Sequence, residues 1–198
     1  MGDAANTARK VVALFALTLG VASTAAFAAQ ACPAPDKLRA EAIDRSFTQD
    51  KNLAGMSKPL HSEGRLTASS DAVVWHMTTP FDVATTITAK GIVQSVDNGP
   101  AQPVGPGSAE IGISVAKSMA AMMRGQWDEL KTMFDVAVSP VPAAGDWTVK
   151  LTPLDPRLLS VVGIITVRGC TDVDDVTIER ADGDRETIRF GVKSATTQ

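Results

Sequence analysis

The stretch VVWHMTTPF, residues 73–81, decides the fold because it places a large aromatic side chain in a clear strand pattern that a proline closes. Trp75 and Met77 fall at alternate positions, so they share one face of a β-strand. Pro80 cannot donate to a β-ladder and therefore ends that strand. The β-branched run at 83–88 predicts a second strand beside the first. With 5% aromatic residues and no tyrosine in the chain, we interpret the tryptophan strand as the floor of a core or of a cavity.

Turn-forming residues separate further strands on both sides of this pair. The other expected strands lie at 60–68, 92–96, 147–152, 163–167, 173–178 and 187–190. Helical periodicity predicts helices at 36–46, 108–124 and 127–134, together with a short turn that contains Leu158. The helix at 108–124 carries a stripe of methionines, which is typical of a core and also suits varied apolar ligands. The pattern is that of a mainly β protein with helices.

Residues 1–28 have the features of a secretory signal peptide. Two basic residues precede an apolar run at 11–22, and AFA at 26–28 is an A-x-A cleavage site. We expect cleavage after Ala28, which leaves a single mature domain at 29–198 that works outside the cytoplasm, in a bacterial periplasm or outside the cell. An uncleaved anchor is the alternative, but the apolar run is short for a membrane-spanning helix.

Export determines how the two cysteines are interpreted. In an oxidising compartment Cys32 and Cys170 favour a disulfide that joins the mature N-terminus to a late strand. Lipidation of Cys32 is the alternative, but the AQA sequence at 29–31 does not resemble a lipidation site. Neither cysteine has a partner at a zinc-binding spacing, so we expect no metal site there.

Composition and scattered motifs limit the classes of function. A length of 198 residues with 44% hydrophobic residues fits one soluble domain with a sizeable core. With a net charge of -3 and no basic cluster, the chain lacks the positive surface that contacts phosphates, so we expect no nucleic acid as a partner. The aspartates at 172, 174 and 175 could bind calcium, but a solvated acidic turn is the better interpretation. We expect no cofactor.

Four short motifs, in their order and spacing, resemble the LolA family of periplasmic outer-membrane lipoprotein carriers. They are FTQ at 47–49, GRL at 64–66, WHMTTP at 75–80, and Trp147 followed by LTP at 151–153. The resemblance implies an unclosed, strongly curved antiparallel β half-barrel covered by helices. Family members have an arginine and a proline in the turn before the tryptophan strand, where this chain has Ser70 and Asp71. We therefore interpret the chain as a divergent member.

The resemblance also implies a function. Such a protein is a periplasmic carrier that shields the acyl chains of a lipoprotein, lipid or glycolipid between the inner and the outer membrane. The implied partners are the acylated cargo, an inner-membrane donor complex and an outer-membrane acceptor, and we expect a monomer that is not an enzyme. Burial of lipid methylenes is worth ~0.8 kcal/mol each, so an acyl chain needs no charged anchor.

The candidate ligand-binding residues are those that share an apolar face of a predicted strand or helix. They are Trp75, Met77, Phe81, Ile87, Val115, Met119, Met123, Phe134 and Leu158. One alternative is an envelope scaffold that binds a protein through open sheet edges. The other is a secreted hydrolase, for which GISVA at 112–116 resembles a nucleophile elbow and only His61 or His76 could act as the base.

Overall fold

A single antiparallel β-sheet dominates the computed structural model, which describes residues 31–38, 43–69, 72–88, 90–104, 117–139 and 145–191. Its eleven strands lie in the order β6-β5-β4-β3-β2-β1-β11-β10-β9-β8-β7. The strands are β1 (Ile43–Asn52), β2 (Leu60–Ala68), β3 (Ala72–Thr79), β4 (Val83–Thr88), β5 (Gly91–Val96), β6 (Gln102–Pro103), β7 (Phe134–Val138), β8 (Trp147–Pro153), β9 (Ile164–Gly169), β10 (Val173–Glu179) and β11 (Arg185–Phe190). Because β6 and β7 do not pair with each other, the described sheet is unclosed.

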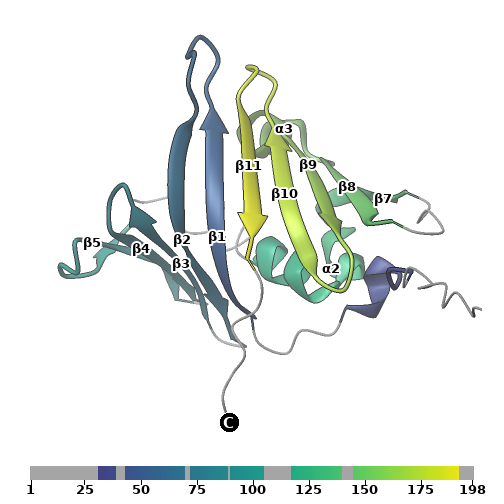
Figure 1. The fold of residues 1–198 in the computed structure, drawn as a ribbon, viewed down its shortest axis with the longest axis horizontal. Helices are drawn as coiled ribbons and strands as arrows, with labels where there is room; N and C mark the ends of the chain where they lie inside the picture. Colours follow the sequence, from purple (N-terminus) through teal and green to yellow (C-terminus); the bar gives the residue numbers. More distant parts are fainter. Residues whose placement is uncertain are drawn as a thin grey trace, which may run out of the picture.

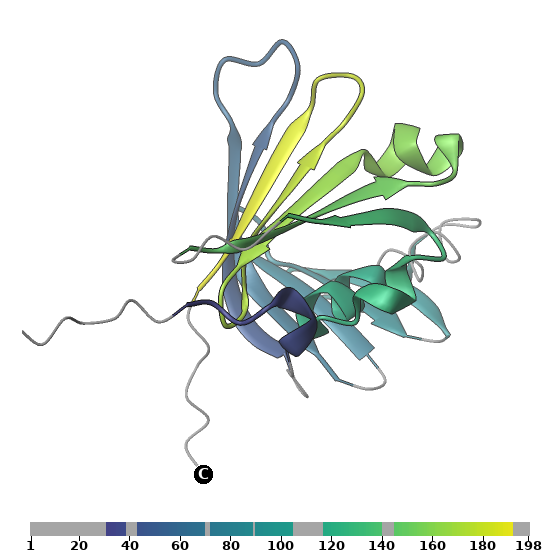
Figure 2. The ribbon, with the colours of Figure 1, turned by 90° about the vertical axis from the view of Figure 1, so that its right-hand side faces the viewer.

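The sheet is strongly curved, and helices lie on its concave side (Figures 1 and 2). Figure 2 shows the helical residues 117–124 and α2 (Trp127–Leu130) between the two diverging halves of the sheet. The 3-10 helix η1 (Pro35–Lys37) lies beside them, and α3 (Pro156–Val162) connects β8 to β9. The chain therefore adopts a mainly β, half-barrel architecture with helices on its concave face.

The alternation of side chains along each strand explains why the sheet has one apolar face. In β8, Trp147, Val149 and Leu151 are fully buried, whereas Lys150 between them is exposed. These residues pack with Ala121, Met122 and other residues of the helical layer in one core cluster. The concave face is thus the core face.

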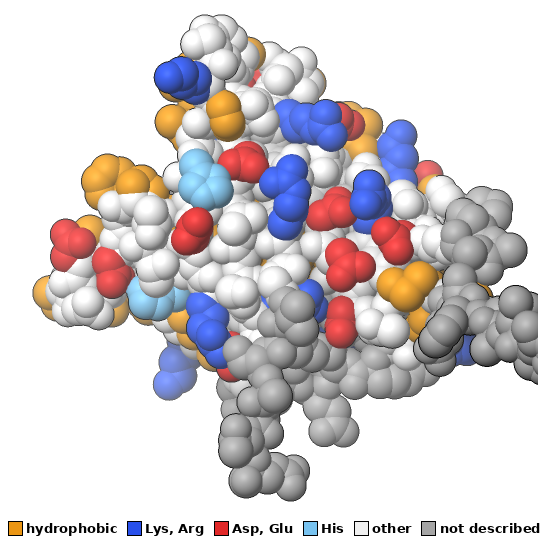
Figure 3. All heavy atoms as spheres, in the orientation of Figure 1, with side chains coloured by type: hydrophobic (Ala, Val, Ile, Leu, Met, Phe, Trp, Pro, Cys, Tyr) orange, Lys and Arg blue, Asp and Glu red, His pale blue; other side chains and the backbone are white. Residues whose placement is uncertain are grey.

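The convex face carries the polar residues of the same strands. Arg189 binds Asp50 at 2.9 Å, and Arg168 lies 3.2 Å from Asp175 on the neighbouring strand. Figure 3 shows charged side chains of both signs distributed over the face formed by β1, β2, β10 and β11. Opposite charges across strands stabilise the register and keep this face in water.

The strand expectations are confirmed, including the tryptophan strand as β3, the hairpin of β4 and β5, and the hairpin of β10 and β11. The helix expected at 36–46 is wrong from Ile43 onward, where β1 begins. The alternating pattern of β1 was obscured because one of its inward-facing residues is an arginine, Arg45, which is buried.

One smaller expectation also differs from the structure. Phe134 continues the helical spacing of Trp127 and Leu130, but the chain turns at 131–133 and Phe134 begins β7. Phe134 stands at the boundary of an element, where spacing alone is least informative.

The predicted disulfide between Cys32 and Cys170 is present, with the two Cα atoms 4.8 Å apart. It attaches the segment before η1 to the turn between β9 and β10. The indole Nε1 of Trp147 donates a hydrogen bond of 2.7 Å to the carbonyl oxygen of Cys170, which fixes the same turn to the core. The bridge therefore secures the N-terminal segment against the buried half of the sheet.

In the segments that the structure describes, no helix is both long enough and apolar enough to span a membrane. The predicted signal peptide at 1–28 lies outside the described residues.

The disulfide should make a large contribution to stability, because it joins residues separated by 138 positions. Under the loop-closure model, a bridge over such a distance stabilises the fold by about 4–5 kcal/mol. Replacing both Cys32 and Cys170 with serine should therefore lower the melting temperature by roughly 10–15 °C. Thermal unfolding followed by circular dichroism measures the change, and the parent protein under reducing conditions is the control. An unchanged melting temperature would contradict this role.

Candidate functional site

The predicted tryptophan strand lies on the concave face of the sheet. Trp75 is directly opposite Leu66 on β2 and Thr85 on β4. Directly opposed residues of antiparallel strands project from the same face. Leu66 is almost fully buried in the core cluster, so Trp75 and its alternate neighbours Val73 and Met77 also face the core side.

A stacked aromatic pair forms the floor of this face. The rings of Phe47 on β1 and Trp75 on β3 stack with their centroids 4.0 Å apart, although β2 separates their strands. Gly64 on β2 is the residue opposite Phe47. A Cβ at Gly64 would overlap the carbonyl oxygen of His76 and would lie 2.6 Å from the Phe47 ring. The glycine therefore allows Phe47 to reach across β2 to Trp75.

The concave face is packed unevenly along the sheet. On β8 and β9 the inward-facing side chains of Trp147, Val149, Leu151 and Val167 are 0% exposed. On β3 and β4 Val73 is buried on the same face, but four other apolar side chains are only half-buried, and they are Trp75, Met77, Val83 and Ile87. The described helices therefore close one half of the sheet and leave the other half partly open.

Five of the six large apolar side chains that are exposed in the described segments lie along one end of the strands, where β1 leads to β2, β3 leads to β4, β5 ends and β8 leads to α3. They are Met56, Leu60, Phe81, Val96 and Leu154. Their exposed fractions range from 47% for Leu60 to 67% for Phe81. The hydrophobic patch near the turn between β3 and β4 is visible at the margin of the face in Figure 3. We call these five residues the apolar rim.

A polar cluster lies on the concave face near the apolar rim. The amide of Gln49 donates a hydrogen bond of 2.6 Å to Glu186, and Arg180 lies 3.4 Å from the same carboxylate. The side chains of Glu186 and Arg180 are only 12% and 21% exposed. The apolar face thus ends in a set of partly buried charges at the open end of the sheet.

Arg45 is a further charged residue on the concave face, and its contacts stabilise the fold. Its guanidinium donates to the carbonyl oxygens of Gly191 and Phe190 and lies 5.9 Å from the centroid of the Phe190 ring. These contacts fix the end of β11 to β1, which explains an arginine on the core face.

The two histidines lie on the convex face. His61 is bonded to Asp50 at 2.7 Å, and His76 to Asp82 at 2.9 Å. The GISVA segment at 112–116 lies outside the described residues. Within the described segments, no group of three histidine, cysteine or acidic side chains is placed to hold a metal ion.

The candidate ligand-binding residues have different environments. Trp75, Met77, Ile87 and Met119 are half-buried, and Met123 and Phe134 are buried in the core cluster. Phe81 lies at the surface rather than in the apolar interior, because the chain leaves the sheet at Pro80. Val115 and the side chain of Leu158 lie outside the described residues. The pairing of Phe47 with Trp75 was not predicted, although Gly64 in a strand pattern is a signal for close packing.

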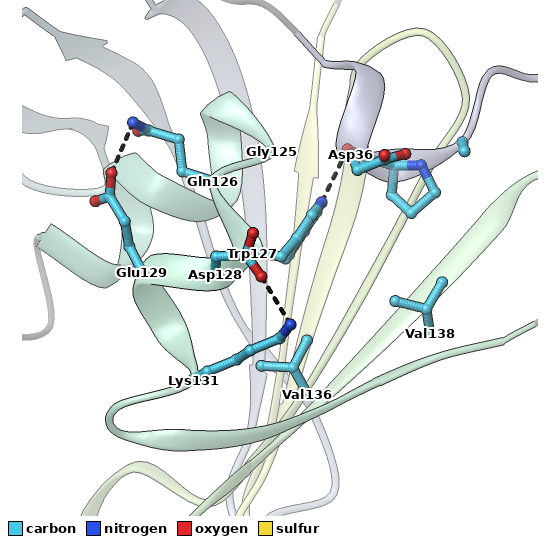
Figure 4. A pocket seen from close by; sticks show the side chains of 11 residues that line it. Asp36, Gly125, Gln126, Trp127, Asp128, Glu129, Lys131, Val136 and Val138 are labelled. Atoms are coloured by element: carbon cyan, nitrogen blue, oxygen red, sulfur yellow. Dashed lines mark hydrogen bonds and ion pairs between the residues drawn. The ribbon is translucent and has the colours of Figure 1, made fainter.

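A separate groove lies between η1, α2 and β7, with a volume of about 630 Å³ (Figure 4). Trp127, Pro35, Val136 and Val138 supply its apolar lining. The indole Nε1 of Trp127 donates a hydrogen bond of 2.8 Å to the carbonyl oxygen of Pro35, which fixes the tryptophan between the two helices. This groove is next to an edge of the sheet, away from the half-open β3 and β4.

Comparisons with known proteins give matches among solved structures. No protein-family model matches the chain. No curated protein matches it in sequence either. Among solved structures, it is similar to the crystal structure of a LolA superfamily protein from Nitrosomonas europaea, with a TM-score of 0.40 and 6% sequence identity over 80% of this chain and 88% of the other. At this low similarity, the candidate site is described from the residues of this chain alone.

The close contact at Gly64 can be tested by adding a single methyl group. Gly64→Ala should reduce the free energy of unfolding by about 2–3 kcal/mol, because Phe47 and the β3 backbone must move. Gly55→Ala is the matched control, since a Cβ there meets nothing within 4 Å and only the positive φ of 85° opposes it, at about 1 kcal/mol. Chemical denaturation of both variants provides the measurement. Equal losses would show that the Phe47–Gly64 contact is not important.

The charge cluster on the convex face should be sensitive to pH. Hydrogen bonds that the His61 ring donates, first to Asp50 and then to Glu63, raise the pKa of His61 above its ordinary value. The stabilisation from protonated His61 is therefore complete below the unfolded pKa of about 6.5 and is lost as the pH rises through the raised folded pKa. Asp50→Asn should move the His61 pKa back towards its ordinary value in an NMR titration. Asp44→Asn, which removes the ion pair with Arg65 on the same face, should leave the midpoint unchanged. An unchanged midpoint in Asp50→Asn would contradict this assignment.

Proposed function

We propose that the protein is an exported carrier that holds the acyl chains of a lipoprotein, lipid or glycolipid on the half-open part of its concave face. In this proposal the carrier works in the periplasm, receives its cargo from an inner-membrane donor and delivers it to an outer-membrane acceptor. It acts by binding rather than by catalysis.

The observation that carries the proposal is the contrast between the two halves of the sheet. The core-facing side chains of Trp147, Val149, Leu151 and Val167 on β8 and β9 are completely buried, whereas Trp75, Met77 and Ile87 on the same face remain half-buried. Apolar side chains on a core-facing surface are normally packed to high density. An apolar ligand over β3 and β4 would complete this packing.

The apolar rim supports an entry route for such a ligand. Its side chains lie at the end of the sheet towards which β3 and β5 run, so an acyl chain entering there meets Met77 and Val83 next. Exposed apolar groups of this kind mark interaction sites. The cluster of Gln49, Glu186 and Arg180 near the rim offers hydrogen-bonding groups to the polar part of a cargo.

The energetics of an acyl chain agree with this route. Burial of about ten methylene groups at ~0.8 kcal/mol each gives about 8 kcal/mol, which corresponds to micromolar affinity before the cost of ordering the chain. The apolar face can therefore bind an acyl chain without a charged anchor. The disulfide is compatible with the oxidising compartment that the proposal requires.

The test measures binding of a fluorescent fatty acid to the purified, oxidised protein. Met77→Glu places a charge in the half-open region, so affinity should fall about tenfold or more, because the carboxylate resists dehydration by the acyl chain. Val74→Glu is the matched control, since Val74 is also half-buried in β3 but faces the convex side. Both variants should retain cooperative thermal unfolding. Binding that is absent in the parent protein, or equal in both variants, would contradict the proposal and favour an envelope scaffold.

A further inference from the structure

The two edges of the sheet differ in their protection. β6 has only two residues, Gln102 and Pro103, and its proline cannot donate to a further strand. β7 is five residues long, from Phe134 to Val138, and contains neither proline nor lysine. Natural proteins usually protect an edge strand with such residues to prevent unwanted pairing. The edge of β7 therefore lacks the residues that usually prevent pairing with a strand of another protein.

The backbone of β7 is oriented to receive one. Ser139 donates to the carbonyl oxygen of Thr148 on one side of the strand, and the carbonyl oxygen of Met133 accepts from Leu154. Because hydrogen bonds to one neighbour alternate along an antiparallel strand, the residues at even positions direct their N–H and C=O groups away from β8. Within the described part of the chain, no strand pairs with this outer side.

The groove next to β7 adds a pocket for side chains (Figure 4). Val136 and Val138 line it from β7, and Trp127 and Pro35 line it from the helical side. A strand added beside β7 would place alternate side chains on this concave side of the sheet. Apolar side chains at alternate positions would fill the groove.

The charges of the groove favour a basic partner. Three carboxylates line it, those of Asp36, Asp128 and Glu129, against one lysine, Lys131. Lys131 pairs with Asp128 at 2.7 Å, and Lys37 pairs with Asp36 at 3.1 Å. Glu129 accepts a hydrogen bond of 2.8 Å from the neutral amide of Gln126, so its negative charge is the one in the lining that would attract lysine or arginine.

We infer that β7 and its groove bind an extended segment of a partner protein, which adds to the sheet edge and carries apolar residues at alternate positions with lysine or arginine among them. The outward backbone groups select a peptide over an acyl chain, because a hydrocarbon has no groups to pair with them. This site is separate from the half-open face of β3 and β4 and does not depend on lipid carriage.

A phage-displayed library of random peptides, panned on the intact oxidised protein, tests this inference. Peptides with alternating apolar residues and at least one basic residue should be enriched. The best enriched peptide, fluorescently labelled, then provides the probe for fluorescence anisotropy. Val138→Pro removes an outward N–H without touching the ladder to β8, so affinity for this peptide should fall about tenfold or more. Asp135→Asn, on the convex side of the same strand, is the matched control and should bind normally.

A second variant keeps the test decisive if Val138→Pro does not fold. Glu129→Lys should weaken binding of the same peptide at least about threefold, because it reverses the charge that attracts the basic residue. Lack of enrichment, or affinity for the peptide that neither variant reduces, would overturn the inference. A dimer of the parent protein in sedimentation velocity that Val138→Pro dissociates would also overturn it, since β7 would then pair with a second copy.

Discussion

The concave face of the sheet carries the core side chains, and the fold depends on how that face is removed from water. The helical residues 117–124 and α2 share one core cluster with buried side chains of β1, β2 and the β7 to β11 half, where Trp147, Val149 and Leu151 are completely buried. The β3 and β4 half keeps half-buried apolar side chains instead. Because burial of apolar surface is the main source of stability, this uneven cover separates a fully packed part of the sheet from a partly open part.

The stack of Phe47 on Trp75 connects these two halves. Phe47 is buried on β1, at the centre of the sheet, and Trp75 lies on β3, where the cover becomes incomplete. Gly64 makes the contact possible by leaving the space above β2 empty. The pair therefore gives the half-open region a rigid floor that belongs to the core. The disulfide fixes the opposite side, at the turn between β9 and β10.

Much of the sheet could be predicted from the sequence, because alternating β-branched residues and turn signals mark β3, β4, β5, β10 and β11. The start of β1 could not, since Arg45 occupies a core-facing position through hydrogen bonds to carbonyl groups that are 145 residues or more away. Phe134 was misplaced for a related reason, because a three-residue turn separates it from α2. Such long-range and turn contacts leave no periodic signal.

The candidate site was predictable only in part for the same physical reason. Periodicity places Trp75 and Met77 on one face, but it does not show which half of a curved sheet the helices cover. Phe81 follows the tryptophan strand closely in sequence, yet Pro80 directs the chain out of the sheet and leaves the ring at the surface. The open edge of β7 likewise depends on the order of strands, which spacing does not reveal.

The central claim is that the half-open concave face holds an acyl chain. It is tested most directly by NMR of the protein with labelled methionine methyl groups, titrated with stearic acid that carries a spin label near its methyl end. The claim predicts strong broadening of the Met77 and Met119 methyl signals, because both side chains are half-buried on the concave side. Broadening confined to Met133, which precedes β7, or no saturable broadening at all, would contradict it.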